Sequence, residues 1–166
     1  MVIASHVIFS AYGFWLPNDP RGSWSDFVGS WELLRFGRAT KADVTHSLAA
    51  EPHNHALRLA AKKLLRYSPV QFTGIQARAV GRGFARFVEK SGIRVSACSI
   101  LSEHVHMVIE RHSYPVEQIV TLLKGEATRA LIREGLHPFH GVSPDDRPPT
   151  PWARGEWKVF LDSEAD

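Results

Sequence analysis

The chain has 166 residues, of which 44% are hydrophobic and 22% are charged, a composition typical of a folded domain with a buried core. No apolar run approaches the roughly 18 to 20 residues of a membrane-spanning helix, and the amino terminus has no signal-peptide pattern, so we expect a cytoplasmic protein without a membrane partner. The net charge is only +3, and the one cysteine, Cys98, excludes an internal disulfide and a cysteine-based zinc cluster.

The first predicted element is a strand at residues 2–9, where β-branched and apolar residues occupy both faces, as in the centre of a sheet. Tryptophans among prolines and glycines follow from Gly13 onward. This composition predicts a turn-rich insertion without regular structure at about residues 13–53.

Two helices are predicted next, at about residues 54–66 and 73–90. The second carries Arg78, Arg82 and Arg86 every four residues on the side opposite its apolar stripe. Like charges at this spacing repel, and a phosphate backbone would relieve the repulsion. We therefore expect these arginines to bind nucleic-acid phosphates without sequence preference, with a solvated basic face as the alternative.

The remaining predicted elements are a strand at residues 93–100, a tight turn at 101–103, a strand that opens with His104-Val105-His106, a helix at about 115–135, a loop at 136–151 and a last strand at 156–161. His137 and His140, in the loop, are predicted to be surface residues. The order of elements is that of the split βαβ, ferredoxin-like arrangement, an α+β fold. We expect one antiparallel sheet with helices on one face and the strand with both histidines in its middle.

His104 and His106 are separated by one hydrophobic residue on a predicted strand, so both imidazoles point to the same face of the sheet. Two neighbouring imidazoles can share one metal ion. The alternative is a pair of ordinary histidines satisfied by hydrogen bonds. His6, on the first strand, is a candidate for a further ligand, with a hydrogen-bonded buried histidine as the alternative.

Four segments of the chain resemble, in order, motifs of one known family. Residues 101–109 are similar to the histidine motif of single-tyrosine HUH insertion-sequence transposases, and most similar to the branch called REP-associated tyrosine transposases. The other three segments are residues 12–22, residues 122–125 and residues 151–157. Together the four segments span nearly the whole chain.

The resemblance implies a transposase that binds single-stranded or hairpin DNA and, in DNA transposition, cleaves and rejoins it through a 5′-phosphotyrosine. His104 and His106 would hold Mg²⁺ or Mn²⁺, which polarises a phosphate oxygen. The same resemblance places Lys124, Arg154 and Lys158 near the DNA. It also suggests a homodimer, because enzymes of this kind often pair.

The chain departs from the family at its nucleophile. The family's tyrosine lies on a helix after the last strand, whereas this sequence has no tyrosine after Tyr114. We expect a chain that is truncated before the tyrosine helix and inactive alone, because neither Tyr12, Tyr67 nor Tyr114 is predicted to replace the nucleophile. The alternatives from other classes are a catalytically silent nucleic-acid-binding module and a metal-dependent phosphoesterase that activates water.

Overall fold

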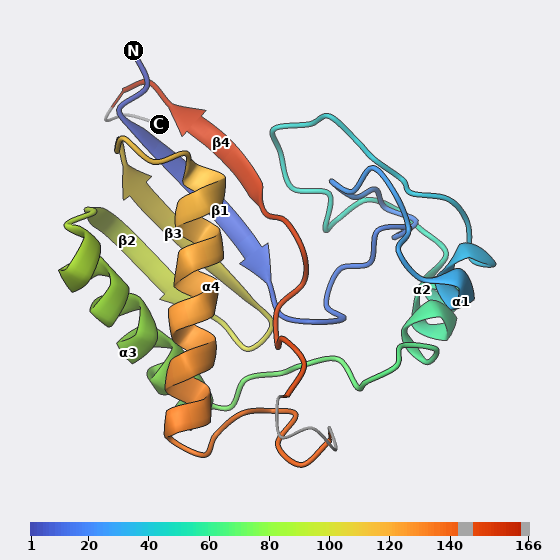
Figure 1. Ribbon diagram of the computed structural model, residues 1–166. Coiled ribbons are helices and arrows are strands. Elements are labelled where there is room, and N and C mark those ends of the chain that lie inside the picture. The colour runs from blue at the N-terminus through green and yellow to red at the C-terminus, as the bar shows by residue number, and fades with distance from the viewer. Residues whose placement is uncertain (143–147, 164–166) are drawn as a thin grey trace. The chain divides into compact units, whose positions relative to one another are not determined.

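The computed structural model describes residues 1–142 and 148–163. Two units divide the chain: a larger one made of Met1–Tyr12 and the residues from Val70 onward, and a smaller one made of Gly13–Pro69 (Figure 1). The smaller unit contains the predicted insertion and continues past residue 53, so the first predicted helix belongs to it and not to the sheet domain.

The larger unit is built on a four-stranded sheet in the order β2-β3-β1-β4, in which every pairing is antiparallel. Its elements are β1 (Ala4–Ser10), α3 (Gly74–Ser91), β2 (Val95–Ile100), β3 (His104–Glu110), α4 (Val116–Arg133) and β4 (Trp157–Leu161). Both helices cover the same face of the sheet (Figure 1). The predicted α+β fold, an antiparallel sheet with helices on one face, is confirmed, and β3 lies in its interior as expected.

Local signals explain where α3 begins and ends. The Thr73 side chain accepts a hydrogen bond from the Gln76 backbone while the Gln76 side chain accepts one from the Thr73 backbone, which forms a capping box. At the other end Gly92 adopts a left-handed conformation with φ of 69°, which favours glycine. The predicted boundaries of this helix are therefore correct to within one residue.

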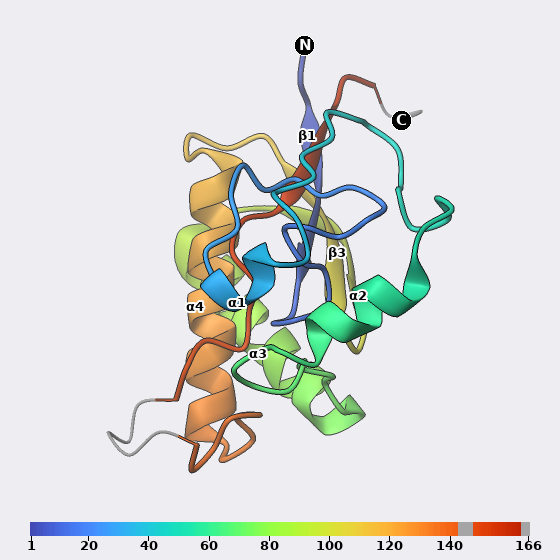
Figure 2. The same cartoon turned by 90° about the vertical axis from the view of Figure 1, so that its right-hand side faces the viewer.

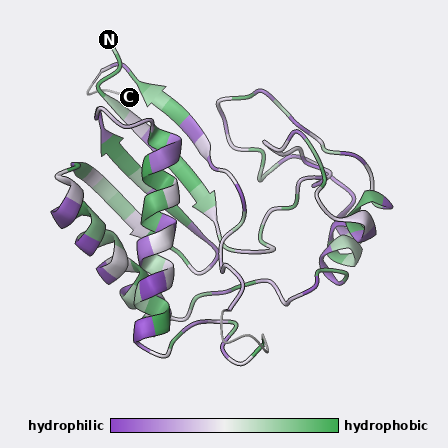
Figure 3. Cartoon of the chain, viewed as in Figure 1, coloured by the Kyte–Doolittle hydropathy of each residue, from purple (hydrophilic) through white to green (hydrophobic). Residues whose placement is uncertain are grey.

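The core of the larger unit lies between the sheet and its helices. On β1 and β3, the side chains of Val7, Phe9, Val105 and Met107 face α3 and α4 and are almost fully buried. Figure 3 shows the hydrophobic residues gathered on the strands, while hydrophilic residues recur along the helices. Among the described helices, none combines the length and the apolar character needed to cross a bilayer.

The smaller unit is mostly irregular and contains two short helices, α1 (Trp31–Leu34) and α2 (His55–Lys62) (Figure 2). The sequence pattern did not predict α1, which is a single turn without a side-chain cap. A small core of Leu16, Leu33 and Ala61 joins residues from both helices. The unit also contains a buried ion pair between Asp19 and Arg21, with Nε of the arginine 2.8 Å from Oδ1 of the aspartate.

Candidate metal and nucleic-acid site

Strand β3 divides its side chains between the two faces of the sheet. Val105, Met107 and Ile109 are buried beneath the helices, whereas His104 and His106 alternate with them and are partly exposed on the opposite face. The backbone of β3 is paired on both sides, with β1 and with β2, so its register is fixed by two hydrogen-bonded ladders. The two imidazoles therefore project from a rigid strand onto the face without helices.

The two imidazoles converge at their Nε2 atoms, which lie 3.1 Å apart, with ring centroids 5.0 Å apart. Two nitrogen ligands about 2.1 Å from one ion, at about 90 to 110° to each other, are roughly 3.0 to 3.4 Å apart. The Nε2 atoms of His104 and His106 thus have the separation of two ligands of one cation. Among the described residues, no group of three histidine, cysteine, aspartate or glutamate side chains is arranged to hold a metal.

His6 lies beside the pair on β1 and contacts the other nitrogen of His106. The distance from His6 Nε2 to His106 Nδ1 is 3.2 Å, and the two rings are stacked with an interplanar angle of 21°. Trp157 on β4 packs its ring edgewise against His6, with centroids 5.6 Å apart. His6 is therefore a hydrogen-bonded neighbour of His106, placed on the side of that ring away from His104.

Burial makes the imidazoles of His6 and His104 easier to keep neutral. It lowers the pKa of His104, and the nearby His106 lowers it further while the Glu103 carboxylate raises it. Burial is also the main cause that lowers the pKa of His6, again with a contribution from His106. A neutral imidazole offers the lone pair that a metal ion needs.

The predicted phosphate-binding arginines lie on α3, in the helical layer and not on the histidine face. Arg78 and Arg86 are exposed. Arg82 forms a two-pronged ion pair with Glu134 at the end of α4, in which its Nε donates to Oε1 at 2.9 Å. The structure thus brings acidic residues of α4 beside the arginine stripe, which the sequence of α3 alone did not reveal.

The three basic residues that the resemblance placed near the DNA have different surroundings. Lys124 Nζ donates to the backbone oxygens of Ala153 at 3.1 Å and Gly155 at 2.6 Å, so it holds the segment that precedes β4 against α4. Burial lowers the pKa of Lys124 to about 8. Arg154, between those two carbonyls in the sequence, is exposed.

Lys158 lies on the helical side of the sheet. It pairs with Val7, a core-facing residue of β1, in the strand register and forms an ion pair with Glu117 of α4. The described structure therefore does not bring Lys158 to the histidine pair. Trp157, one residue earlier, is on the histidine face and contacts His6. The only sequence signal for this contact is that successive side chains of a strand point to opposite faces of the sheet.

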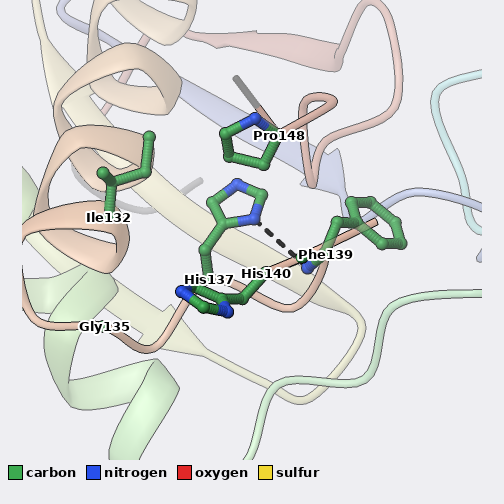
Figure 4. Close-up of a pocket in the computed structure, with 7 residues that line it drawn as sticks. Ile132, Gly135, His137, Phe139, His140 and Pro148 are labelled. Carbon is green, nitrogen blue, oxygen red and sulfur yellow. Dashed lines mark hydrogen bonds between the residues drawn. The ribbon is translucent and has the colours of Figure 1, made fainter. Parts of the chain in front are cut away.

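A separate hollow of about 280 Å³ lies at the end of α4, among residues that include Ile132, His137, His140 and Pro148 (Figure 4). The prediction that His137 is a surface residue is wrong, because it is only 5% exposed. Its Nδ1 accepts a hydrogen bond from the backbone nitrogen of Phe139 at 3.2 Å, which satisfies one polar atom of the buried ring. His140 is exposed, as predicted.

No family model matches this chain, and no curated protein matches it either. Among solved structures, it is similar to a candidate transposase from Deinococcus radiodurans R1, with a TM-score of 0.47 and 11% sequence identity. The similarity covers 99% of this chain and 83% of that one.

Proposed function

We propose that this chain is the metal-binding and DNA-binding domain of an HUH-type transposase that acts on single-stranded or hairpin DNA. The observation that carries the proposal is the convergence of His104 and His106, whose Nε2 atoms lie 3.1 Å apart on the face of the sheet without helices. The four transposase-like segments, which appear in the family's order, support the same interpretation.

His104 and His106 would hold two adjacent positions on Mg²⁺ or Mn²⁺. Mg²⁺ usually keeps several waters and takes phosphate oxygens from its substrate, so few protein ligands are needed, and imidazole also suits Mn²⁺. When bound, such an ion would polarise a phosphate oxygen and help the 3′ oxygen to leave. The role of the two histidines is to fix the ion on an accessible surface where a DNA strand can approach.

DNA would be held by side chains outside this pair. Arg78, Arg86 and Arg154 are exposed and suited to phosphate contacts, whereas Arg82, Lys124 and Lys158 would first have to leave the partners they now have. Trp157, on the histidine face, offers an aromatic ring on which an unpaired base could stack. A homodimer remains a prediction from the resemblance, and light scattering of the purified protein measures it.

Our proposal assigns no nucleophile among residues 1–166. Because none of Tyr12, Tyr67 and Tyr114 is predicted to act as the nucleophile, we expect residues 1–166 by themselves to bind metal and DNA without forming a phosphotyrosine link.

Metal binding is the first test. Titration calorimetry with Mn²⁺ should give an affinity that falls at least tenfold in the variant His104→Ala/His106→Ala. The matched control His140→Ala removes an exposed histidine of the larger unit and should leave the affinity unchanged. Equal Mn²⁺ affinities of the wild-type protein and the double variant would refute the proposed site.

DNA chemistry is the second test. Labelled hairpin and single-stranded DNA are incubated with the protein and Mn²⁺, then separated on native and denaturing gels. A native-gel shift without cleavage is the expected result, and a covalent adduct would identify one of the existing tyrosines as a nucleophile. Cleavage without an adduct would favour the phosphoesterase, and the absence of any shift would remove DNA as the partner.

A further inference from the structure

We infer that His6 is a positioning residue, which accepts a hydrogen bond from His106 Nδ1 and so keeps the lone pair of His106 on Nε2, the atom that faces His104. The inference rests on the proposed function, because it concerns how the proposed metal ligand is prepared. It assigns His6 a role through His106 and excludes His6 as a direct ligand.

The first step is the connectivity of the three rings. His106 is engaged through both of its nitrogens, with Nδ1 at 3.2 Å from His6 Nε2 and Nε2 at 3.1 Å from His104 Nε2. A neutral imidazole has one donor nitrogen and one acceptor nitrogen. The three rings therefore form a chain of hydrogen bonds that runs in one of two directions, and the two directions place the proton of His106 on different nitrogens.

The second step is the choice of direction. If His6 donated to Nδ1 of His106, the proton of His106 would be on Nε2, and that atom could not bind a metal. If His6 accepts, His106 carries its proton on Nδ1 and presents a lone pair at Nε2. Histidines that bind metals usually donate the other ring N–H to an acceptor, which fixes the tautomer and the ring orientation. His6 Nε2 is placed to be that acceptor.

The third step is the rigidity of the acceptor. His6 is in the middle of β1, where it pairs with Val108 of β3 and Val159 of β4, so its backbone is held on both sides. Ile8 is the residue directly opposite His106, and His6 reaches His106 along the diagonal of the antiparallel pair. The edgewise ring of Trp157 limits the ring of His6 from the other side.

This arrangement has a specific consequence for the metal-free protein. His104 Nε2 then donates to His106 Nε2, so His104 must move its proton to Nδ1 before both Nε2 atoms can bind one ion. His106 needs no such change. Metal binding should therefore alter the tautomer of His104 and leave that of His106 as it was.

The experiment is histidine ¹⁵N NMR of the whole protein, first without metal and then with Zn²⁺ as a diamagnetic probe that suits imidazole. In the metal-free protein we expect His106 to be protonated at Nδ1. His6→Phe keeps an aromatic ring beside Trp157 but removes the acceptor, so it should give a mixed His106 tautomer and a Zn²⁺ affinity about 10-fold lower. His6→Gln supplies an acceptor oxygen and should restore the His106 tautomer and the Zn²⁺ affinity of the wild-type protein. The matched control, His140→Phe, should change neither.

Three results would overturn the inference: a metal-free His106 protonated at Nε2, a His106 tautomer unaffected by His6→Phe, or a Zn²⁺-dependent shift of His6 Nε2 that indicates direct coordination. If His6→Phe does not fold, the inference is still tested by the tautomer of His106 in the wild-type protein and by whether His6→Gln retains that tautomer. The metal-free spectrum involves neither metal nor DNA. The inference about His6 can therefore be overturned while the Mn²⁺ titration supports the proposed metal site, and the metal site can be refuted while the predicted His106 tautomer is observed.

Discussion

Gly83 of α3 lies so close to Ala127 of α4 that a Cβ atom on the glycine would be 2.6 Å from the Cα of the alanine. Backbone atoms line this contact on the α4 side, so they cannot move away as the end of a long side chain could. The close approach of the two helices therefore depends on the absence of a side chain at Gly83.

We expect Gly83→Ala to lower the free energy of unfolding by about 1 to 3 kcal/mol, the usual range for overpacking a well-packed core. The matched control is Gly125→Ala on α4, where a Cβ would meet only the end of the Arg129 side chain at 3.6 Å. That control should be neutral or stabilising by about 0.5 to 1 kcal/mol, because alanine favours helix more than glycine does. Urea unfolding of both variants measures the difference, and a stabilising Gly83→Ala would contradict the packing described above.

Lys124 should make the stability of the protein depend on pH. Burial lowers its folded-state pKa from 10.5 to about 8. Below about pH 8 the side chain is protonated in both the folded and the unfolded chain, so the full cost of burying the charge is present. Between about pH 8 and 10.5 the folded chain loses this proton while the unfolded chain keeps it, so this contribution to stability rises with pH.

The measurement compares urea unfolding of the wild-type protein and Lys124→Met, since the difference between them cancels the groups that they share. From pH 7 to pH 9.5 the wild-type protein should gain about 2 kcal/mol relative to the variant. A difference that stays constant over this interval would show that the amine keeps its charge while it donates to Ala153 and Gly155.

The arginines of α3 should contribute unequally to DNA binding. If Arg78 and Arg86 contact phosphates, each alanine substitution should reduce the slope of log K against log salt by about 0.7 for a single strand. Arg82→Ala should change the slope less, because Arg82 is paired with Glu134. Glu134→Gln, which releases Arg82, should increase the slope.

Fluorescence anisotropy with a labelled single strand at several salt concentrations measures these slopes. Equal effects of all three alanine substitutions would mean that DNA separates Arg82 from Glu134. No effect of any of them would identify the arginine stripe as a solvated face.

The ion pair of Asp19 and Arg21 should stabilise the smaller unit. The Asp19 side chain is fully buried and also accepts from the Arg21 backbone, while the guanidinium lies 3.7 Å from the centre of the Trp15 ring. Asp19→Ala leaves the arginine charge buried without its partner, which typically costs about 3 to 5 kcal/mol.

Hydrogen exchange resolved by residue measures this loss in the smaller unit. The double variant Asp19→Ala/Arg21→Met removes both charges and should recover part of the protection. A double variant that is less protected than Asp19→Ala would show that the guanidinium stabilises the unit through its contact with Trp15 more than through the carboxylate.

Much of the larger unit could be predicted from the sequence because its signals are local. Thr73 and Gly92 mark the ends of α3, and the alternation of His104, Val105 and His106 determines which side chains share a face. Both signals act within a few residues of the chain, so they hold whatever the rest of the protein does. The order of elements then identified the sheet topology through known rules of connection.

What the sequence did not predict depends on partners that are distant in the chain. The pairing of Arg82 with Glu134 spans two helices, and the burial of His137 follows from the packing of a loop with no periodic pattern. The extent of the smaller unit to Pro69 was missed for a similar reason, because α2 looks like any amphipathic helix until its core partners Leu16 and Leu33 are known.

The location of His104 and His106 at the start of an interior strand limits how this surface can change during evolution. Side-chain direction in β3 alternates at every residue, so a slip of one residue in its pairing with β1 and β2 would exchange the two faces of the strand. Both imidazoles would then enter the hydrophobic core between the sheet and the helices, and Val105 would be exposed to solvent in their place. A slip by two residues would keep the side-chain directions, whereas a slip by one would remove both imidazoles from the exposed face and disturb the core at the same time.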